Sequence, residues 1–525
     1  MAGNVRDSEA FAAGVAAMLL AIALLGAAHL VQANIPFPPL GLAQRLVEVV
    51  PGSVAVFFVE RLGHWALRLF AVGFTVGSVL AGGLVGLLVA RRPATQWAVT
   101  SWAAAAVLAV IALGAYHSEP GAPSLTTYGA LVAVAGAVFA LSLRRALDRL
   151  HRDRVDTQPA RGLVRTRREL LRAGLGGAGL LVAAVVLRQL SGGLGDRGGR
   201  PLVRPAGAGP VRRVVRPPDG PEDQSFLTIR GLTPEITTNQ RHYVVDESII
   251  DPNVEAASWR LRIDGLVGRP LTLGYDELLT LPAVERYVTM QCISNLVGGD
   301  LVSTAKWTGV PLAALLERAG GVGDQAVRVA FHAVGGYTDS LLVAKALDGT
   351  TMVAYGMNDD TLPRAHGYPA RIIAPGIYGM KSVKWLQRIE VVDYDYRGYW
   401  EGSAGWDNVA EIKTASRIDV PGELAAVKGQ ATIAGMAWAG DRGIRRVEVS
   451  FDGGRSWAPA TLRRELARAT WRQWRLPWSP AATGKVQIQV RAFDGLGRPQ
   501  IVTPAPPHPT GASGYHEVEV VVGST

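Results

Sequence analysis

The sequence predicts a multi-domain protein: an N-terminal α-helical membrane domain of about five spans, an α+β domain, and a C-terminal immunoglobulin-like β-sandwich. Three observations support this prediction. The 525 residues exceed the size of one ordinary domain. Apolar residues gather in the first third as long runs, and from about Ser225 the chain changes to short β-rich runs. We expect a membrane domain at 1–190, a linker at 191–224, the α+β domain at 225–408 and the sandwich at 409–525.

Long apolar runs predict the membrane domain. A bilayer-spanning helix needs about 20 consecutive apolar residues. Four stretches without a charged residue meet this length: Phe11–Val31, Leu69–Ala90, Trp97–Tyr116 and about Ser124–Ser142. A fifth, Ala173–Leu187, is shorter and lies between Arg172 and Arg188. Core helices of a soluble protein are the alternative, but four such runs would need a very large core to cover them.

The basic residues predict how this domain faces the bilayer. The chain has 54 Lys and Arg against 44 Asp and Glu. The excess clusters beside the apolar runs, as in membrane proteins, so we expect no nucleic-acid partner. Arg91 and Arg92 follow the second run, His117–Pro123 has no Lys or Arg, and Arg144–Arg172 holds ten arginines. We therefore expect a multi-pass protein of the cell membrane, with everything after about residue 190 on the extracytoplasmic side.

The fifth run carries a second signal. Thr166–Arg172, which reads TRRELLR, resembles a twin-arginine export signal, although a plain positive-inside anchor has the same composition. We expect the fifth run to be retained as an anchor. The Gly-, Pro- and Arg-rich stretch 191–224 shows no apolar periodicity and is typical of a linker.

Short strands and turns dominate the remainder of the chain. Trp259–Asp264 has the pattern of a strand and Pro311–Ala319 that of a helix, which is α+β in character. From about Ile412 the pattern is almost wholly strands and turns, for example at Val447–Phe451 with its Asp-Gly-Gly turn, and at Lys485–Ala492 and Glu517–Val522. Regular short strands over about 110 residues predict an immunoglobulin-like sandwich.

Cys292 is the one cysteine of the chain, so no intrachain disulfide forms. It ends a strand-like run, Tyr287–Cys292, and a Gly-containing loop follows it. A thiolate in that place suits a soft or high-valent metal, but a small buried apolar residue fits as well. His366–Arg371 and Gly379–Trp385 are basic loops suited to a phosphate, or they are solvated turns. No zinc, P-loop or dinucleotide pattern is present.

Six ordered motifs carry a family resemblance. They are Val288–Asn295, Ser303–Leu312, Ala354–Asn358, Leu362–Arg371, Pro375–Gly376 and Lys381–Trp385. In this order they resemble the sulfite oxidase family of molybdenum enzymes, from about residue 225 to the C-terminus. The resemblance implies a molybdopterin-binding catalytic domain at 225–408. Val447–Trp457 (VEVSFDGGRSW) resembles the family's dimerisation domain, which implies an immunoglobulin-like dimerisation domain at 409–525 and a possible homodimer.

The resemblance also implies a cofactor, Mo-molybdopterin, and roles for individual residues. Cys292 matches the cysteine that ligates molybdenum beside the pterin dithiolene. Residues that match positions binding the pterin and its phosphate are His366, Arg371, Ser382, Val383 and Lys384, and the stretch Asn239–Asp246 adds Asn239, His242 and Tyr243. Tyr396 matches an active-site tyrosine, although a packed tyrosine in an aromatic-rich stretch is the alternative. A phenol beside a metal-oxo centre can donate a hydrogen bond or relay a proton.

The sequence departs from the family at two positions. Family members hold sulfite with arginines where this chain has Val244 and Val297. Losing two cations from an anion site costs several kcal/mol, at about 1.5–3 kcal/mol per charged hydrogen bond, so we expect a substrate other than sulfite. A haem domain is missing, and no histidine falls at the centre of an apolar run. Electrons are therefore expected to pass to a separate partner or to quinone at the membrane.

Together these observations predict an outward-facing, membrane-anchored molybdopterin-dependent oxidoreductase that acts on a small substrate by oxygen-atom or two-electron transfer. An S- or N-oxide reductase, acting for example on oxidised methionine, is the alternative enzyme. A cofactor-free, membrane-attached binding protein is the non-enzymatic alternative, but such a protein would be expected to lose the thiolate and the basic loops. A transporter is disfavoured because the apolar runs hold no charged residues for a substrate path.

Overall fold

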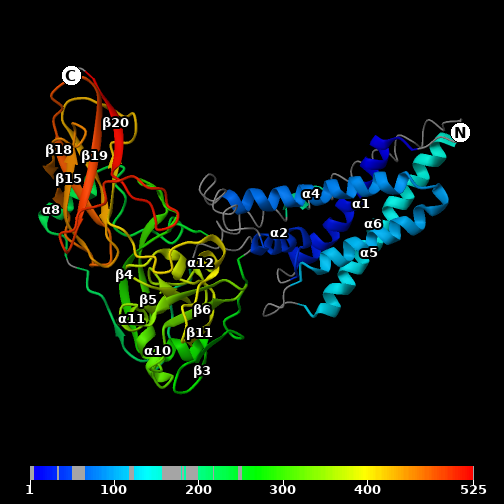
Figure 1. Cartoon of the computed structure of the whole chain (residues 1–525), viewed down its shortest axis with the longest axis horizontal. Helices are drawn as coiled ribbons and strands as arrows, with labels where there is room; N and C mark the ends of the chain where they lie inside the picture. The colour runs from blue at the N-terminus through cyan, green and yellow to red at the C-terminus, as the bar shows by residue number, and fades with distance from the viewer. Residues whose placement is uncertain are drawn as a thin grey trace. The chain divides into compact units, whose positions relative to one another are not determined.

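The computed structural model describes residues 5–31, 35–49, 65–116, 123–155, 179, 182–184, 199–216, 218–245 and 251–523. The chain divides into two compact units, which are described separately (Figure 1). The first contains Met1–Val50, Arg61–Gly195 and Asp246–Asn253; the second contains Pro51–Glu60, Asp196–Val245 and Val254–Thr525. The twin-arginine-like segment lies outside the described residues, as does nearly all of the predicted fifth span.

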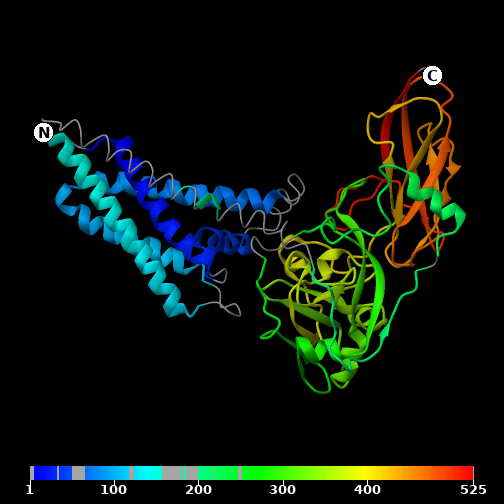
Figure 2. The ribbon, with the colours of Figure 1, turned by 180° about the vertical axis from the view of Figure 1, so that it is seen from behind.

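Helices make up the described part of the first unit. They are α1 (Asp7–Val31), α2 (Pro38–Val49), α4 (Trp65–Ala90), the 3-10 helix η1 (Ala94–Gln96), α5 (Trp97–Leu113) and α6 (Leu125–Val155). Helix α1 lies against α4 and α6, and α5 lies against α6 (Figure 2). Glycine permits the close approach of α1 and α4, because a Cβ at Gly86 would collide with the carbonyl oxygen of Ala10.

Four helical segments in the described part of the chain are long and apolar enough to cross a membrane. They are Asp7–Val31, Leu69–Ala90, Ala94–Leu113 and Leu125–Arg152, and they coincide with the first four predicted spans. Several of their large apolar side chains, such as Leu88 and Val110, are exposed on the surface of the unit. Exposed apolar surface of this kind supports an association with the membrane.

Two sheets form the α+β part of the second unit. The first has the order β1-β4-β5-β8-β10, with β9 paired to β8. Its strands are β1 (Val211–Arg212), β4 (Ala283–Gln291), β5 (Val302–Pro311), β8 (Met352–Met357), β9 (Asp360–Thr361) and β10 (Arg371–Ile373). The second has the order β3-β2-β11-β6-β7. Its strands are β2 (Arg260–Gly265), β3 (Leu271–Gly274), β6 (Arg328–Ala333), β7 (Thr338–Leu342) and β11 (Leu386–Val392).

Short helices connect these strands. They are α8 (Pro221–Gln224), η2 (Ser225–Thr228), α9 (Tyr275–Thr280), α10 (Leu312–Arg318), α11 (Val343–Leu347), η3 (Arg364–His366), η4 (Gly379–Lys381) and α12 (Tyr399–Ala404). The predicted strand Trp259–Asp264 and helix Pro311–Ala319 are confirmed as β2 and α10. Every residue of β8 is buried, as expected of a strand covered on both faces. Phe331 and Trp385 belong to the main core cluster, and Trp307 to a smaller one beside β4 and β8.

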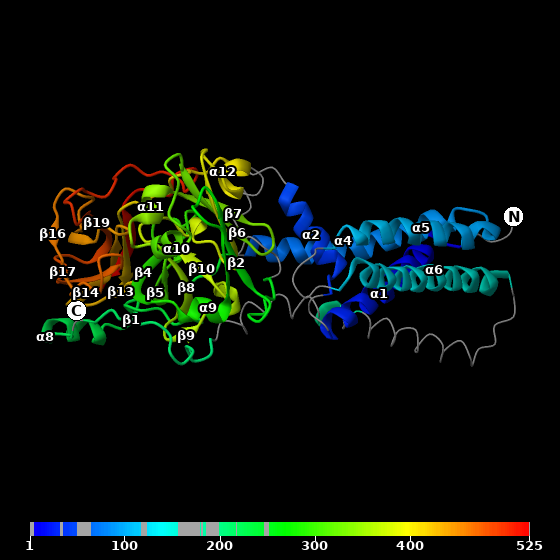
Figure 3. The same cartoon turned by 90° about the horizontal axis from the view of Figure 1, so that it is seen from below.

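The C-terminal part is a sandwich of two sheets, with the orders β12-β14-β18-β17 and β13-β20-β19-β15-β16 (Figure 3). The strands are β12 (Ala415–Val420), β13 (Ala426–Val427), β14 (Ala431–Trp438), β15 (Ile444–Ser450), β16 (Ala458–Pro459), β17 (Thr461–Leu462), β18 (Arg472–Trp478), β19 (Gly484–Asp494) and β20 (His516–Val522). Ile433 and Trp474 from one sheet pack with Val447, Ile488 and Val520 from the other. The predicted sandwich is confirmed.

The sandwich holds the end of β4. The indole N–H of Trp438 donates to Oε1 of Gln291 over 2.8 Å. The backbone N–H of Trp471 donates to the Thr289 hydroxyl over 2.7 Å, and the Arg417 guanidinium donates to the carbonyl of Gly299 over 2.7 Å. These bonds fix both the strand that leads to Cys292 and the loop that follows it.

Part of the predicted linker packs against the α+β sheets. Strand β1 pairs in parallel with β4. The Arg204 side chain donates to the carbonyls of Leu279, Gly209 and Leu281 over 3.0, 2.8 and 2.7 Å. An arginine that donates hydrogen bonds to buried carbonyls adds no apolar periodicity to the sequence. The composition of this stretch therefore resembles that of a linker, although part of it packs against the sheets.

Candidate functional site

Cys292 directly follows β4, at the start of a loop that returns to β5. Its backbone N–H donates to the carbonyl of Leu301 over 2.9 Å, and the N–H of Leu301 donates to Oδ1 of Asn295 over 2.9 Å. The side chain is 8% exposed. Burial raises the pKa of the Cys292 thiol, but the hydroxyl of Ser294, 2.9 Å from Sγ, and the N–H groups of Ile293 and Ser294 oppose that rise. The loop thus supplies donors that stabilise a thiolate in a nearly dry place.

Two tyrosines lie within electrostatic reach of this thiol. Burial and the charge of Cys292 both raise the pKa of Tyr243. The same two causes raise the pKa of Tyr378 to about 12. The backbone N–H of Tyr243 donates to the hydroxyl of Ser303 on β5 over 3.1 Å, which ties the 239–245 segment to the sheet beside Cys292. Both phenols stay protonated, so they offer hydrogen-bond donors near the thiolate.

Two buried histidines lie next to these groups. The ring of His242 stacks on Tyr243 with centroids 5.4 Å apart and meets Trp307 edge-on at 5.7 Å. His366 donates from Nε2 to the carbonyl of Asn239 over 2.8 Å. Burial lowers the pKa of His242 to about 3 and also lowers that of His366, so both rings are neutral at physiological pH.

Asn239 joins this segment to the loop after β8. Its side-chain amide donates to the carbonyl of Met357 and to Oδ2 of Asp360, each over 3.3 Å. Its Oδ1 accepts a hydrogen bond from the side chain of Asn358 over 2.8 Å. The three predicted residues of the 239–246 stretch, Asn239, His242 and Tyr243, therefore lie together beside His366.

Two buried cations complete the cluster. Arg371 begins β10, and its guanidinium donates to the carbonyls of His366 and Ser382 over 3.1 and 2.8 Å while lying 5.4 Å from the Trp307 ring. Lys384 donates to the carbonyl of Val245 over 3.4 Å. Gly367, at φ 104°, allows the chain to pass close to both Lys384 and Arg371. A Cβ at this position would lie 3.0 Å from Cβ of Lys384 and 3.2 Å from Cβ of Arg371.

Ser382 and Val383 lie between η4 and Lys384. The backbone N–H of Ile372 on β10 donates to the carbonyl of Val383 over 2.9 Å. Turn η4 packs directly on the end of β4, because a Cβ at Gly379 would lie 3.3 Å from the carbonyl oxygen of Gln291 and 2.5 Å from the Tyr243 hydroxyl. The structure therefore brings together all eight residues predicted to bind a cofactor, and Tyr243 links them to Cys292.

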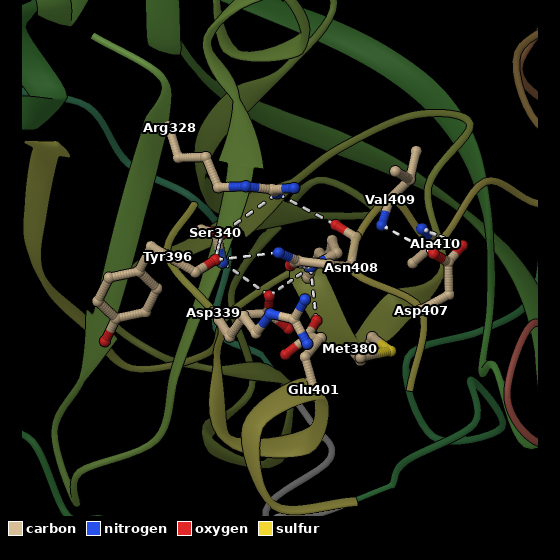
Figure 4. Close-up of polar contacts among 12 residues, drawn as sticks. Arg328, Asp339, Ser340, Met380, Tyr396, Glu401, Asp407, Asn408, Val409 and Ala410 are labelled. Carbon is tan, nitrogen blue, oxygen red and sulfur yellow. Dashed lines mark hydrogen bonds and ion pairs between the residues drawn. The ribbon is translucent and has the colours of Figure 1, made fainter. Parts of the chain in front are cut away.

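Tyr396 belongs to a different group of side chains. Its ring centroid lies 6.0 Å from the rings of both His332 and Tyr394, and its carbonyl accepts hydrogen bonds from Ser340 and Asn408 over 2.8 and 3.2 Å. Figure 4 shows the Tyr396 ring pointing away from the polar contacts around Asp339. None of these contacts joins Tyr396 to Cys292. The active-site role of Tyr396 therefore stays a prediction, and these contacts are those of the alternative, a packed tyrosine.

Trp307 and Tyr378 are members of the site that the sequence reasoning assigned no role. Trp307 is fully buried on β5 and contacts both His242 and Arg371. Tyr378 precedes η4 and lies near the thiol. Trp307 lies within the Ser303–Leu312 motif, on the strand that follows the Cys292 loop, and membership of that motif is the signal that could have identified it.

The comparisons with known proteins agree on one family. An oxidoreductase molybdopterin binding domain matches residues 248–400, and a Mo-co oxidoreductase dimerisation domain matches residues 408–504. The chain is 34% identical to the sulfite oxidase of Gallus gallus over 318 residues, which cover 51% of this chain and 68% of that protein. It is 32% identical to the mitochondrial sulfite oxidase of Macaca fascicularis over 339 residues, covering 55% and 61% respectively.

Among solved structures, the sulfane dehydrogenase SoxCD from Paracoccus pantotrophus has a TM-score of 0.47 at 23% identity, covering 55% of this chain and 81% of that chain. The chain spans less than two thirds of the length of the mammalian sulfite oxidases it matches, 61% for Macaca fascicularis and 55% for Mus musculus. The two matched domains and the identity over two thirds of the Gallus gallus protein decide the assignment. The chain belongs to the sulfite oxidase family of molybdopterin-dependent oxidoreductases.

Proposed function

We propose that this protein is a membrane-anchored oxidoreductase that binds Mo-molybdopterin, with the Cys292 thiolate as a metal ligand. It acts on a small substrate by oxygen-atom or two-electron transfer. The observation that supports this most is the largely buried cluster next to the one thiol of the chain, made by Asn239, His242, His366, Arg371, Ser382, Val383 and Lys384 with the partly buried Tyr243. Such a cluster could bind the pterin and its phosphate, while the nearby Cys292 binds the metal.

The residues present fit this cofactor. His242 donates from Nδ1 to the carbonyl of Tyr243 over 3.1 Å, and its buried Nε2 has no hydrogen-bond partner among the described residues. A buried polar atom without a partner costs free energy, so a ligand donor there would be stabilising. When bound, molybdopterin would supply the dithiolene ligands and the two-electron redox chemistry.

The chain's own residues would hold the two ends of the group. The Arg371 guanidinium and the Lys384 ammonium would bind a phosphate through charge-assisted hydrogen bonds. Both groups are buried, which strengthens their attraction for an anion relative to a solvated site. At the other end, the Ser294 hydroxyl and the neighbouring amides would donate hydrogen bonds to the Cys292 thiolate when it binds a metal.

The rim of the site suggests a neutral or weakly charged substrate. Leu296 and Val297, on the loop after Cys292, are 55% and 36% exposed, and Val244 directly follows Tyr243 in the chain and is partly buried. Apolar side chains at the two positions that match substrate-binding arginines remove the charges that would hold sulfite. A small neutral oxygen acceptor, or in the reverse direction an S- or N-oxide, suits this rim better.

The apolar helices support anchoring to the cell membrane, and the arginine pattern supports an extracytoplasmic position for the site. Electrons would then pass to a separate protein or to quinone at the membrane surface. The matched dimerisation domain supports a homodimer. These partners belong to the proposal because the chain matches only part of its relatives.

Turnover with dyes tests the proposed activity. Detergent-purified protein should reduce a one-electron acceptor dye with a suitable oxygen acceptor, or oxidise a reduced dye with a sulfoxide, and Cys292→Ser should do neither. Glu390→Gln, at a half-buried glutamate of β11 that pairs with His332 and Arg388, serves as the control outside the metal-binding loop. Equal turnover by wild type and Cys292→Ser would contradict the proposal.

Protease accessibility tests the proposed side of the membrane. Arg167→Lys with Arg168→Lys should leave the second unit inaccessible to protease added outside the cell. Unchanged accessibility would contradict export by that signal.

A further inference from the structure

A buried charged cluster lies beside η4 and includes its last residue, Lys381. The Lys381 ammonium donates to Oδ1 of Asp339 over 2.7 Å, to Oε1 of Glu401 over 2.6 Å and to Oδ1 of Asn408 over 3.4 Å. The side chains of Lys381, Asp339 and Glu401 are all 0% exposed. They come from η4, β7 and α12, and Figure 4 shows Asp339, Glu401 and Asn408 converging on one point.

The charges of this cluster do not balance when both carboxyls are ionised. Two carboxylates share the single Lys381 ammonium. A second cation that reaches the cluster is Arg328, which donates from Nε to Asp395 over 2.6 Å and from Nη1 to the carbonyl of Asn408 over 3.1 Å. Asp395, 54% exposed, balances Arg328 at the surface, where Arg397 also lies 3.8 Å away.

One buried negative charge is therefore left over. An uncompensated buried charge costs several kcal/mol. A proton retained on the carboxyl pair removes that charge. The arrangement of lowest free energy is thus one carboxylate and one carboxylic acid around Lys381.

Hydrogen bonding decides which carboxyl keeps the proton. Asp339 accepts from Lys381 and from the backbone N–H of Ser340, each over 2.7 Å, and from the Tyr337 hydroxyl over 3.2 Å. Glu401 accepts from Lys381 alone on Oε1, and its buried Oε2 has no hydrogen-bond partner in the described part of the chain. Asp339 is therefore the better stabilised anion. Burial and the charge of Asp339 raise the pKa of Glu401 to about 7, which makes its proton exchangeable near neutral pH.

Tyr337 and η4 connect this cluster to the thiol. The single hydroxyl proton of Tyr337 is shared between two acceptors, the carbonyl of Met380 at 2.9 Å and Oδ2 of Asp339 at 3.2 Å. Met380 follows Gly379, the residue that packs on the Gln291 carbonyl, and Gln291 directly precedes Cys292. One three-residue turn thus contacts both the acidic cluster and the strand that leads to Cys292.

We propose that Glu401 holds an exchangeable proton for the Cys292 site, with Asp339 and Tyr337 connecting it to the η4 turn. This inference rests on the proposed function. In the oxidising direction, a substrate X takes its oxygen from water: X + H2O → XO + 2 H⁺ + 2 e⁻. The two electrons pass in turn to an external one-electron acceptor. Ionised Glu401 takes up one of the two protons and later releases it to solvent, and the other proton leaves with solvent directly.

The alternative is a purely structural cluster that anchors η4 to β7 and α12. An anchor needs only one carboxylate per ammonium, and its loss would change stability without changing how activity depends on pH. A proton-holding carboxyl makes a different prediction. Glu401→Gln keeps the shape and leaves the Lys381–Asp339 ion pair, so the variant is expected to fold, and its effect should show in protonation.

Infrared titration of the full-length protein tests the proton without any turnover. Wild type should show a carboxylic-acid C=O band that disappears as the pH rises through about 7. The band should be missing from Glu401→Gln and present in Glu390→Gln, a control in a half-buried glutamate that pairs with His332 and Arg388. A titrating band of wild-type size in Glu401→Gln would overturn the proposal.

The dependence of kcat on pH tests the link to the site. With a one-electron acceptor dye, wild-type kcat should rise as the pH passes through about 7, because the ionised form is the proton acceptor. Glu401→Gln should lose that rise, with kcat on the alkaline side lower by on the order of 100-fold and KM little changed. Asp339→Asn should also distort the profile, and Glu390→Gln should keep it. A wild-type profile in Glu401→Gln would overturn the role of Glu401 as a proton acceptor.

The two experiments also separate this inference from the proposed function. A wild type without turnover would overturn the proposed function and the link to Cys292, and the infrared titration would still decide whether Glu401 holds the proton.

Discussion

The ring of His366 meets the ring of His242 edge-on, with centroids 5.2 Å apart and planes at 80°. Each imidazole is enclosed, and Arg371 lies close enough to oppose a charge on either ring. Both histidines are therefore neutral in the folded protein, and protonating either ring lowers the free energy of unfolding.

This pair predicts acid sensitivity. The pKa of His242 is lowered to about 3, so between about pH 6.5 and 3 the unfolded chain binds more protons than the folded chain. Stability should therefore fall as the pH falls below 6.5, by about 2 kcal/mol at pH 5 from His242 alone, at about 1.4 kcal/mol per pKa unit. Urea unfolding of wild type and His242→Phe at pH 7 and pH 5 measures this. Equal losses in the two proteins would contradict the prediction.

Arg371 is predicted to be irreplaceable by lysine. An ammonium cannot reproduce the fork that reaches the carbonyls of His366 and Ser382 while facing a phosphate. Arg371→Lys should therefore retain much less pterin after purification, and its free energy of unfolding should drop by about 1–3 kcal/mol. Arg397→Lys, at a largely exposed arginine, is the matched control and should match wild type. Full pterin retention in Arg371→Lys would show that the guanidinium does not hold the cofactor.

The apolar rim predicts that arginines would restore sulfite binding. Val244→Arg with Val297→Arg places two cations where the family's substrate arginines stand. Each new charged hydrogen bond contributes about 1.5–3 kcal/mol, so the KM for sulfite should fall at least about tenfold. Leu296→Arg, on the same exposed loop, controls for added charge alone. An unchanged KM for sulfite in the double variant would show that these positions do not set substrate choice.

Replacing Tyr337 or Tyr396 by Phe is predicted to have opposite consequences for kcat. The hydroxyl of Tyr337 contacts Met380 and Asp339 beside η4, whereas Tyr396 packs with His332 and Tyr394. Tyr337→Phe should lower kcat at least about tenfold, in the range of a lost proton-transfer or hydrogen-bonding group. Tyr396→Phe should stay within about twofold of wild type. The reverse ranking in steady-state assays would return the active-site role to Tyr396.

Much of the site is predictable from short motifs because its parts are local in sequence. Cys292 ends a strand and opens a loop, and Ser382, Val383 and Lys384 are consecutive, so their relative places follow from the chain itself. Strands β2 and β19 likewise follow from apolar alternation and turn residues.

Other features depend on distant packing, and no local pattern reveals them. Lys381 and Asp339 are 42 residues apart, and Lys381 and Glu401 are 20 apart, so their ion pairs exist only after β7, η4 and α12 meet. Arg204 satisfies carbonyls 75 and 77 residues away, which a linker-like composition conceals. The motif around Tyr396 matches the family, but the direction of its side chain is set by contacts with β6 and the neighbouring Tyr394.

The central claim is that Cys292 binds the metal of a molybdopterin held by the buried cluster. Molybdenum and released pterin per chain, with the number of sulfur ligands from X-ray absorption at molybdenum, measured in purified wild type and Cys292→Ser, test it most directly. We predict about one molybdenum and about one pterin per wild-type chain, and one sulfur ligand fewer in Cys292→Ser, because the dithiolene and the phosphate-binding residues remain while the thiolate is lost. Molybdenum far below the pterin content in wild type, or the same number of sulfur ligands in the two proteins, would contradict the account.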